Sequence, residues 1–216
     1  MALRTPPSWL QQGSHPAEND RLTMQSIFTT SGIIGADSLA ITAQGTPNMT
    51  VNVAAGHGAI VSSVSNAGVY VSYNDATAVL TITTADPSNP RVDRIVMTVN
   101  DAYYSGLNNN VTFTVIAGTP AVSPVAPATP ANSLSLATIA VAAGATSIGA
   151  GVITDTRTSA ASKFLVWTTT TRPSAPTTGS FGFNTTLLQL EYYNGSTWVA
   201  AGGGGGGFDP FMLMGA

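Results

Sequence analysis

Few residues of this chain have the types and spacing that acid–base or metal chemistry requires. Its two histidines, His15 and His57, lie in turns flanked by glycine or proline, and neither begins a His-Glu-x-x-His zinc motif. The chain has no cysteine, which excludes thiolate metal ligands and disulfides. We therefore predict no catalytic, cofactor-binding or metal-binding residue and expect a protein that is not an enzyme.

Three carboxylates lie close enough in sequence to be considered for glycan cleavage. That reaction needs one carboxyl group as acid and another as base or nucleophile, and Asp86, Asp93 and Asp101 are the candidates. Asp93 stands between Arg91 and Arg94, whose positive charges lower a carboxyl pKa and favour an ion pair. The pattern predicts an ion-pair cluster at the edge of a strand, and a polysaccharide-cleaving enzyme is the alternative.

Two groups of aromatic residues could contact a ligand. Tyr103 and Tyr104 precede a Ser-Gly-Leu-Asn-Asn-Asn run, whereas Tyr192, Tyr193 and Trp198 flank an Asn-Gly-Ser turn. Aromatic faces can stack on sugars, and nearby amides can hydrogen-bond to hydroxyl groups. We predict that the first pair belongs to a β-hairpin packing against a neighbouring subunit. The alternative is a glycan-binding surface at either group.

The composition indicates a protein that buries surface in an assembly. Charged residues make up 8% of the 216 residues, against roughly 25% in average soluble proteins. Seven basic residues without a cluster provide no surface for a phosphate backbone. No apolar run approaches the roughly 20 residues of a spanning helix, and no signal peptide is evident. We expect a homo-oligomer with no nucleic-acid partner and no membrane span.

Alternating residues predict that these groups are carried by β-strands. Apolar and polar residues alternate around Met49–Val53 and Val111–Val115, as in half-buried strands. The run Ile95–Val99 is apolar on both faces, which predicts a central strand. The predicted fold is all-β, with an antiparallel β-sandwich at residues 31–157. An N-terminal docking arm with a short helix precedes it at 1–30. A linker at 158–163, a small β tip module at 164–200, and a Gly-rich tether with an apolar terminus at 201–216 follow it.

Both ends of the chain carry apolar residues outside any predicted core. Six consecutive glycines precede the last nine residues. A phosphate-binding glycine loop follows a strand and begins a helix, and this run does not match that pattern. They predict a flexible tether. We expect apolar side chains of the two ends to form an assembly interface with a neighbouring subunit. The residues concerned are Trp9, Leu10, Phe208, Phe211, Met212, Leu213 and Met214.

A proline-rich stretch at residues 117–133 has prolines at intervals of three, at Pro124, Pro127 and Pro130. This spacing matches one turn of a polyproline II helix. We predict an extended strap that crosses between two strands, and a ligand for an SH3-like domain is the alternative.

Several motifs follow one another along nearly the full length of the chain. They are Pro7-Ser8-Trp9-Leu10-Gln11, His15-Pro16-Ala17-Glu18, Asn89 to Val96, Gly118-Thr119-Pro120, Ala137 to Val141, Ile153 to Arg157, and Arg172 to Val199. Their order resembles that in minor tail proteins, found in the tail tip or baseplate of long-tailed bacteriophages, especially those infecting actinobacteria. The tip module is similar to small β modules of phage tail fibres, in which a Tyr-Asn-Gly-Ser-x-Trp turn closes the unit.

The resemblance implies a viral structural protein. Such a protein would be made in the host cytoplasm and would reside in the virion, at the tail tip or baseplate. It would form a homotrimer, the commonest state of such parts, and assemble with other tail-tip or baseplate proteins to support host attachment. The alternative is a receptor-binding protein that contacts a glycan of the host cell wall.

Overall fold

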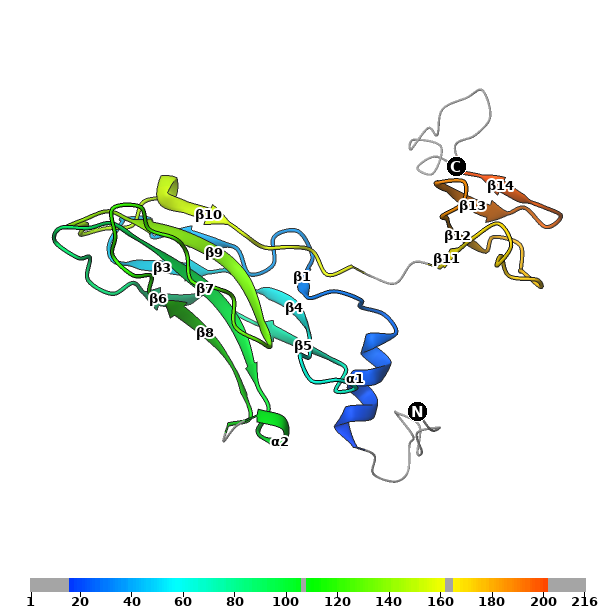
Figure 1. Cartoon of the computed structure of the whole chain (residues 1–216), viewed down its shortest axis with the longest axis horizontal. Coiled ribbons are helices and arrows are strands. Elements are labelled where there is room, and N and C mark those ends of the chain that lie inside the picture. The colour runs from blue at the N-terminus through cyan, green and yellow to red at the C-terminus, as the bar shows by residue number, and fades with distance from the viewer. Residues whose placement is uncertain (1–15, 106–107, 162–164, 202–216) are drawn as a thin grey trace. The chain divides into compact units, whose positions relative to one another are not determined.

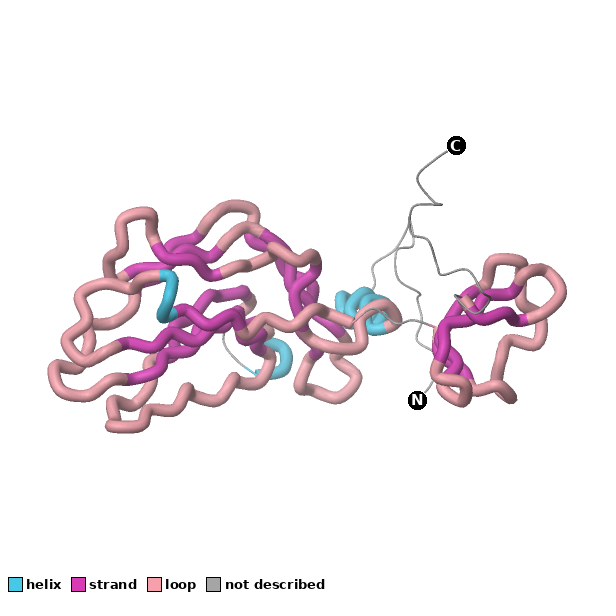
Figure 2. Tube along the Cα trace, turned by 90° about the horizontal axis from the view of Figure 1, so that it is seen from above, coloured by secondary structure: helices cyan, strands magenta, loops and turns pink. Residues whose placement is uncertain are grey.

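The computed structural model describes residues 16–105, 108–161 and 165–201. The chain divides into two compact units, an N-terminal unit that ends at Ser162 and a C-terminal unit that begins at Lys163. The division falls within the linker predicted at 158–163. Strands and loops make up nearly all of both units (Figures 1 and 2). The all-β prediction is confirmed, while the finer classification as a sandwich stays a prediction.

The largest sheet of the N-terminal unit has four antiparallel strands in the order β10-β9-β7-β8. The strands are β7 (Arg91–Asn100), β8 (Asn110–Ile116), β9 (Ser133–Val141) and β10 (Ile153–Asp155). As the continuous apolar run predicted, β7 is a central strand. Its residues Ile95, Val96 and Met97 are all buried, and a register shift at Ile95/Val96 interrupts the pairing with β9.

Two three-stranded antiparallel sheets complete the N-terminal unit, in the orders β1-β4-β5 and β2-β3-β6. The first contains β1 (Gly32–Ile34), β4 (Gly56–Val61) and β5 (Val69–Asn74). The second contains β2 (Ile41–Ala43), β3 (Thr50–Val53) and β6 (Ala78–Thr81). A short 3-10 turn, η1 (Ala150–Val152), precedes β10.

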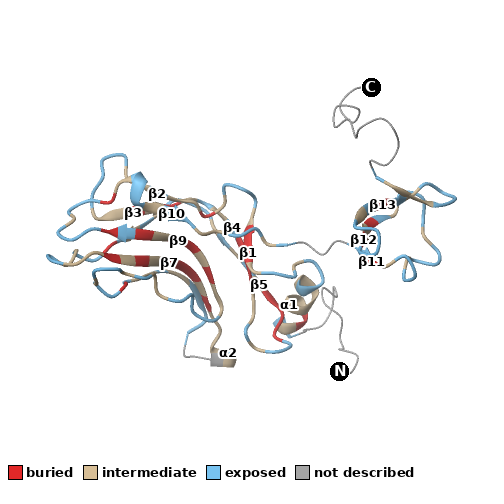
Figure 3. Ribbon diagram, turned by 45° about the horizontal axis from the view of Figure 1, so that its top comes forward, coloured by how far each residue is buried: buried red, intermediate tan, exposed pale blue. Residues whose placement is uncertain are grey.

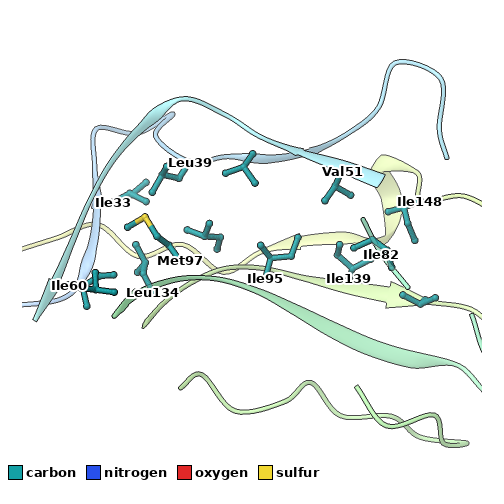
Figure 4. Close-up of a cluster of buried hydrophobic side chains, with 14 residues drawn as sticks. Ile33, Leu39, Val51, Ile60, Ile82, Ile95, Met97, Leu134, Ile139 and Ile148 are labelled. Atoms are coloured by element: carbon teal, nitrogen blue, oxygen red, sulfur yellow. The ribbon is translucent and has the colours of Figure 1, made fainter. Parts of the chain in front are cut away.

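The core of the N-terminal unit joins all three sheets. Fully buried positions follow β7 and β9 (Figure 3). In Figure 4, Ile95, Met97 and Ile139 point toward Val51 and Leu39 from the opposing strands and loop. Burying one such aliphatic side chain stabilises the fold by about 1.5–3 kcal/mol. This packing fixes the ends of β5 and β7, where the candidate site lies.

Helix α1 (Ala17–Gln25) belongs to the N-terminal unit and packs against β5. Glu18 and Asp20 lie in its first turn, where a negative charge interacts favourably with the helix dipole. The turn before β5 approaches the helix closely, because a Cβ on Gly68 would lie 2.4 Å from the backbone of Arg21. The short helix expected within residues 1–30 is therefore present and is fixed against the sheet.

The first residues of the predicted linker are hydrogen-bonded to the N-terminal unit. The amide of Ile33 donates to Thr158 O at 2.7 Å, and the amide of Ala160 donates to Ile33 O at 2.9 Å. Ile33 and Ser159 form a parallel bridge. Residues 158–161 thus lie along β1.

The C-terminal unit is one four-stranded sheet in the order β11-β12-β13-β14. Its strands are β11 (Val166–Trp167), β12 (Phe181–Asn184), β13 (Gln189–Tyr193) and β14 (Trp198–Ala200). The last three pair antiparallel, whereas β11 pairs parallel to β12. Because β11 is parallel to its neighbour, a long connection, residues 168–180, has to cross the sheet between them.

Candidate functional site

A cluster of ionised and aromatic side chains lies where α1, β5 and the end of β7 meet. The guanidinium of Arg21 lies 4.9 Å from the ring centre of Tyr70 and 5.5 Å from that of Tyr104. Its Nε donates to Ala67 O at 2.8 Å and its Nη2 to the Tyr104 hydroxyl at 3.1 Å. Cation–π contacts and hydrogen bonds together hold Arg21 in one position.

Asp101, which follows β7, joins this cluster from the opposite side. Its carboxylate accepts the Tyr70 hydroxyl at 2.8 Å and the Tyr103 amide at 3.0 Å, and lies 3.7 Å from Arg21. Burial, followed by the hydrogen bond to Asp101, raises the pKa of Tyr70 to about 12. Tyr70 therefore stays neutral at physiological pH and donates to the carboxylate.

Two adjoining pockets of about 490 and 360 Å³ open on this cluster, and both are lined by Ala17, Arg21 and Asp101. The larger also contains the amides of Asn100, Asn109 and Asn110, the hydroxyl of Ser72, and the valines of β5, β7 and β8. We call the two together the Arg21 pocket. Asp20 also lines the larger pocket, and Glu18 lines the smaller. Amides, three carboxylates, one guanidinium and apolar walls provide the hydrogen-bonding groups that a ligand with several hydroxyl groups requires.

The predicted contact residues Tyr103 and Tyr104 both line the smaller pocket. They lie in α2 (Ala102–Ser105), a short helix in the connection of the antiparallel hairpin that β7 and β8 form. Their rings meet edge to face at 4.9 Å. Tyr104 is held by Arg21, while Tyr103 is 83% exposed and presents its ring to solvent.

The second predicted group, Tyr192, Tyr193 and Trp198, does not form one surface. Tyr193 and Trp198 are directly paired and their ring centres are 5.6 Å apart, with Trp167 at 4.6 Å from Trp198. Tyr192 points to the other face of the sheet because successive residues of a strand alternate. The three residues therefore cannot stack on one sugar.

Sequence reasoning missed the polar centre of the C-terminal unit. Glu191 is 1% exposed, and its carboxylate accepts hydrogen bonds from Trp167 Nε1 at 3.1 Å, Asn184 Nδ2 at 3.0 Å and Arg172 Nε at 2.9 Å. Gln189 also donates to it. Arg172 first, and then the amide and indole donors, lower the pKa of Glu191 to about 2. A permanently ionised, fully bonded carboxylate stabilises the fold and is unsuited to proton transfer.

The predicted ion-pair cluster of the N-terminal unit is present in part. Asp93 accepts Arg91 Nε at 2.8 Å and the amide of Gly118 at 2.8 Å, and is fully buried. The pair lies at the beginning of the central strand β7, of which Arg91 is the first residue. Arg94 is not part of it, because its side chain projects to the other face and donates to Pro127 O.

That contact fixes part of the proline-rich strap, which has no regular secondary structure between β8 and β9. The expected extended crossover therefore fits the structure.

Every arginine in the described ranges donates to another segment of its own unit. The acceptors are carboxylates, hydroxyls and backbone carbonyls. The pairs are Arg21 with Ala67 and Asp101, Arg91 with Asp93 and Thr83, Arg94 with Pro127 and Ser135, Arg157 with Asp155 and Ser38, and Arg172 with Glu191.

The remaining predicted residues are placed as follows. His57 lies in β4, paired with Tyr73, and not in a turn. His15 and the candidate assembly residues Trp9, Leu10, Phe208, Phe211, Met212, Leu213 and Met214 lie outside the described residues. Within residues 16–105, 108–161 and 165–201, no group of three His, Cys, Asp or Glu side chains could hold a metal ion.

Comparisons with known proteins yield no match to a family model, a curated protein or a solved structure. In the part of the chain that the structure describes, no helix has the length and apolar character needed to cross a membrane.

Proposed function

We propose that this protein is a non-enzymatic structural component of a phage tail tip or baseplate, which forms a homo-oligomer and supports host attachment. The observation that carries the proposal is the state of the five described arginines, each bonded within its own unit. The exposed surface is then formed mainly by uncharged Thr, Ser, Asn and Ala. Protein interfaces are depleted in Lys, Glu and Asp at their centres.

Exposed apolar side chains on the sheets support the same function. Tyr73 on β5 is 72% exposed and Val79 on β6 is 60% exposed, and Val111 on β8 is 44% exposed. Each lies on a strand at the edge of its sheet. An edge strand has unpaired backbone groups that a neighbouring subunit can use for pairing.

The first test is the solution mass of the full chain, measured by light scattering across a concentration series. We expect a trimer or larger closed ring. The second test is mass spectrometry of purified phage particles that carry the gene, followed by antibody labelling of intact virions. Labelling at the tail tip supports the proposal. A monomer at every concentration, together with its absence from particles, would refute it.

The Arg21 pocket favours a second candidate function, that of a receptor-binding protein for a host cell-wall glycan. The exposed ring of Tyr103 stands beside a pocket with amide, carboxylate and hydroxyl groups. A glycan array on the full chain tests it directly. Tyr103→Ala should weaken binding by about 0.5–1.5 kcal/mol, the value of one aromatic contact, whereas the matched control Tyr73→Ala should not. Equal affinity for the two variants would exclude this pocket.

A further inference from the structure

The sheet of the C-terminal unit has one apolar face that no described residue of this unit covers. Strand register places two rows of directly paired side chains on it, one row from β11, β12 and β13 and the other from β12, β13 and β14. We call this surface the apolar face. The first row is Val166, Phe183 and Leu190, and the second is Phe181, Tyr192 and Val199.

The exposure of these residues shows that the face is open. Val166 is 60% exposed, Phe181 54%, Leu190 44% and Tyr192 41%. These values are high for large apolar residues that lie side by side on one surface. Contiguous apolar surface of this kind marks a binding site in soluble proteins.

The opposite face of the same sheet is closed. Trp167, Asn184 and Glu191 are buried there, and the connection from β11 to β12 supplies Arg172, which bonds to Glu191. A Cβ on Gly182 would lie 2.5 Å from the Trp167 ring, so the indole lies directly over the sheet. Both charged residues of the range 165–201 are therefore on the closed face, and the apolar face carries none.

The course of the chain after β14 identifies an occupant. The amide of Ala201 donates to Leu190 O at 2.8 Å, so the chain leaves the sheet beside one of the residues of the apolar face. Six glycines follow, and then the segment Phe208–Met214. A six-glycine linker has an average span of about 13 Å, and four strands spaced about 4.8 Å apart have a width of about 14 Å. The tether is long enough to return the segment over the sheet.

We propose that the apolar segment Phe208–Met214 folds back and covers the apolar face of its own chain. Five of its seven side chains are large and apolar. They are Phe208, Phe211, Met212, Leu213 and Met214. Unbranched methionine side chains adapt to an irregular surface, and Asp209 can remain at the rim in water. This assigns the segment an intramolecular contact in place of the expected contact with a neighbouring subunit.

Effective concentration favours the segment's own chain over a second copy. A short flexible linker holds its ligand at a local concentration in the millimolar range. Purified protein at micromolar concentration supplies a neighbour's segment about a thousandfold more dilutely. The inference does not depend on the proposed virion function, because it concerns a contact within the C-terminal unit alone.

The absence of cysteine from the chain allows a direct test by disulfide trapping. The full chain carrying Tyr192→Cys and Phe211→Cys is oxidised at low micromolar concentration. Its matched control carries Ser196→Cys and Phe211→Cys, because Ser196 is exposed in the turn before β14 and lies off the apolar face. We expect the intramolecular disulfide to form at least about fivefold faster for the Tyr192 pair than for the Ser196 pair. This ratio is equivalent to about 1 kcal/mol of docking free energy.

A second variant separates docking from simple reach of the tether. In the Tyr192 pair, replacing Phe208, Met212 and Leu213 by serine should lower the rate to that of the Ser196 control. Deleting residues 208–216 from the unmodified chain should raise the fluorescence of added 1-anilinonaphthalene-8-sulfonate at least twofold. Equal rates for the two cysteine pairs, or no change in dye fluorescence, would overturn the proposal. A disulfide-linked dimer as the main product would assign the face to a second copy instead.

Discussion

Substituting Glu191 by glutamine should destabilise the C-terminal unit by about 2–3 kcal/mol. The carboxylate is 1% exposed, and its bonds to Arg172, Asn184 and Trp167 hold its pKa at about 2 instead of 4.5. At about 1.4 kcal/mol per pH unit, this difference corresponds to an upper value of about 3 kcal/mol. The Arg172 side chain is 23% exposed, so solvent screening reduces the value somewhat. Glutamine would also place an amide donor against the donors that surround Glu191.

The sign of the pH dependence follows from the lowered pKa of Glu191. Its contribution is fully present above the unfolded-state pKa of 4.5, and it is lost as the pH falls toward the folded-state value of about 2. The parent protein should therefore lose stability of the C-terminal unit between about pH 4.5 and 2. The Glu191→Gln variant should be nearly independent of pH in that range, because it has no carboxyl group to protonate.

Tryptophan fluorescence measures this unit selectively. The chain has three tryptophans, two of them in the C-terminal unit, so Trp9→Phe leaves only Trp167 and Trp198 as reporters. Urea unfolding of this background, with and without Glu191→Gln, gives the difference in the free energy of unfolding. Gln189→Ala serves as the control, because it removes a donor at 3.2 Å and leaves the carboxylate ionised. A loss below about 0.5 kcal/mol for Glu191→Gln, or an unchanged pH profile, would refute the reasoning.

Three further predictions concern burial and backbone geometry, and urea unfolding checks each. Asp93→Ala should destabilise the N-terminal unit by about 3–5 kcal/mol, since it leaves Arg91 buried without a carboxylate; a loss below about 1 kcal/mol would contradict this. Gly118→Ala should cost more than about 2 kcal/mol, because its Cβ would lie 2.2 Å from the carbonyl oxygen of Val92; a neutral substitution would show that the strap can shift. Leu188→Gly should stabilise the C-terminal unit by up to about 1 kcal/mol, because Leu188 has φ 52° in an exposed turn, a left-handed conformation that glycine adopts without strain. Destabilisation would mean that the Leu188 side chain packs in the native state.

Period-two alternation predicted the strands that form the core of the N-terminal unit. Thr50–Val53 is β3, and the apolar run within Arg91–Asn100 became the central strand β7. These positions could be inferred because a strand exposes alternate residues to different environments, so its sequence records which face is buried. The same rule places Tyr192 and Tyr193 on opposite faces of one strand, and the prediction that grouped them did not apply it.

The site contacts depend on pairings between distant segments, which a single sequence does not record. Arg21 meets Tyr70 and Asp101 only because α1 packs on β5 beside the end of β7. Glu191 meets Arg172 only through the connection that the parallel pair β11–β12 requires. Low charge made these contacts hard to anticipate, because an isolated ionised residue in a Thr-rich chain is typical of a solvated surface.

The β6 edge is separate from the Arg21 pocket, whereas Val111 on the edge strand β8 lines that pocket. The amides of Asn100 and Asn110 bond to each other and line the Arg21 pocket, next to Tyr103. Val79 lies on the edge strand β6 and does not line that pocket. Glycan binding should therefore respond to changes at Asn110 or Tyr103, while self-assembly should respond to a charge placed on β6. The two proposed functions are compatible in one protein, because a subunit that buries the β6 edge in an oligomer leaves the Arg21 pocket open.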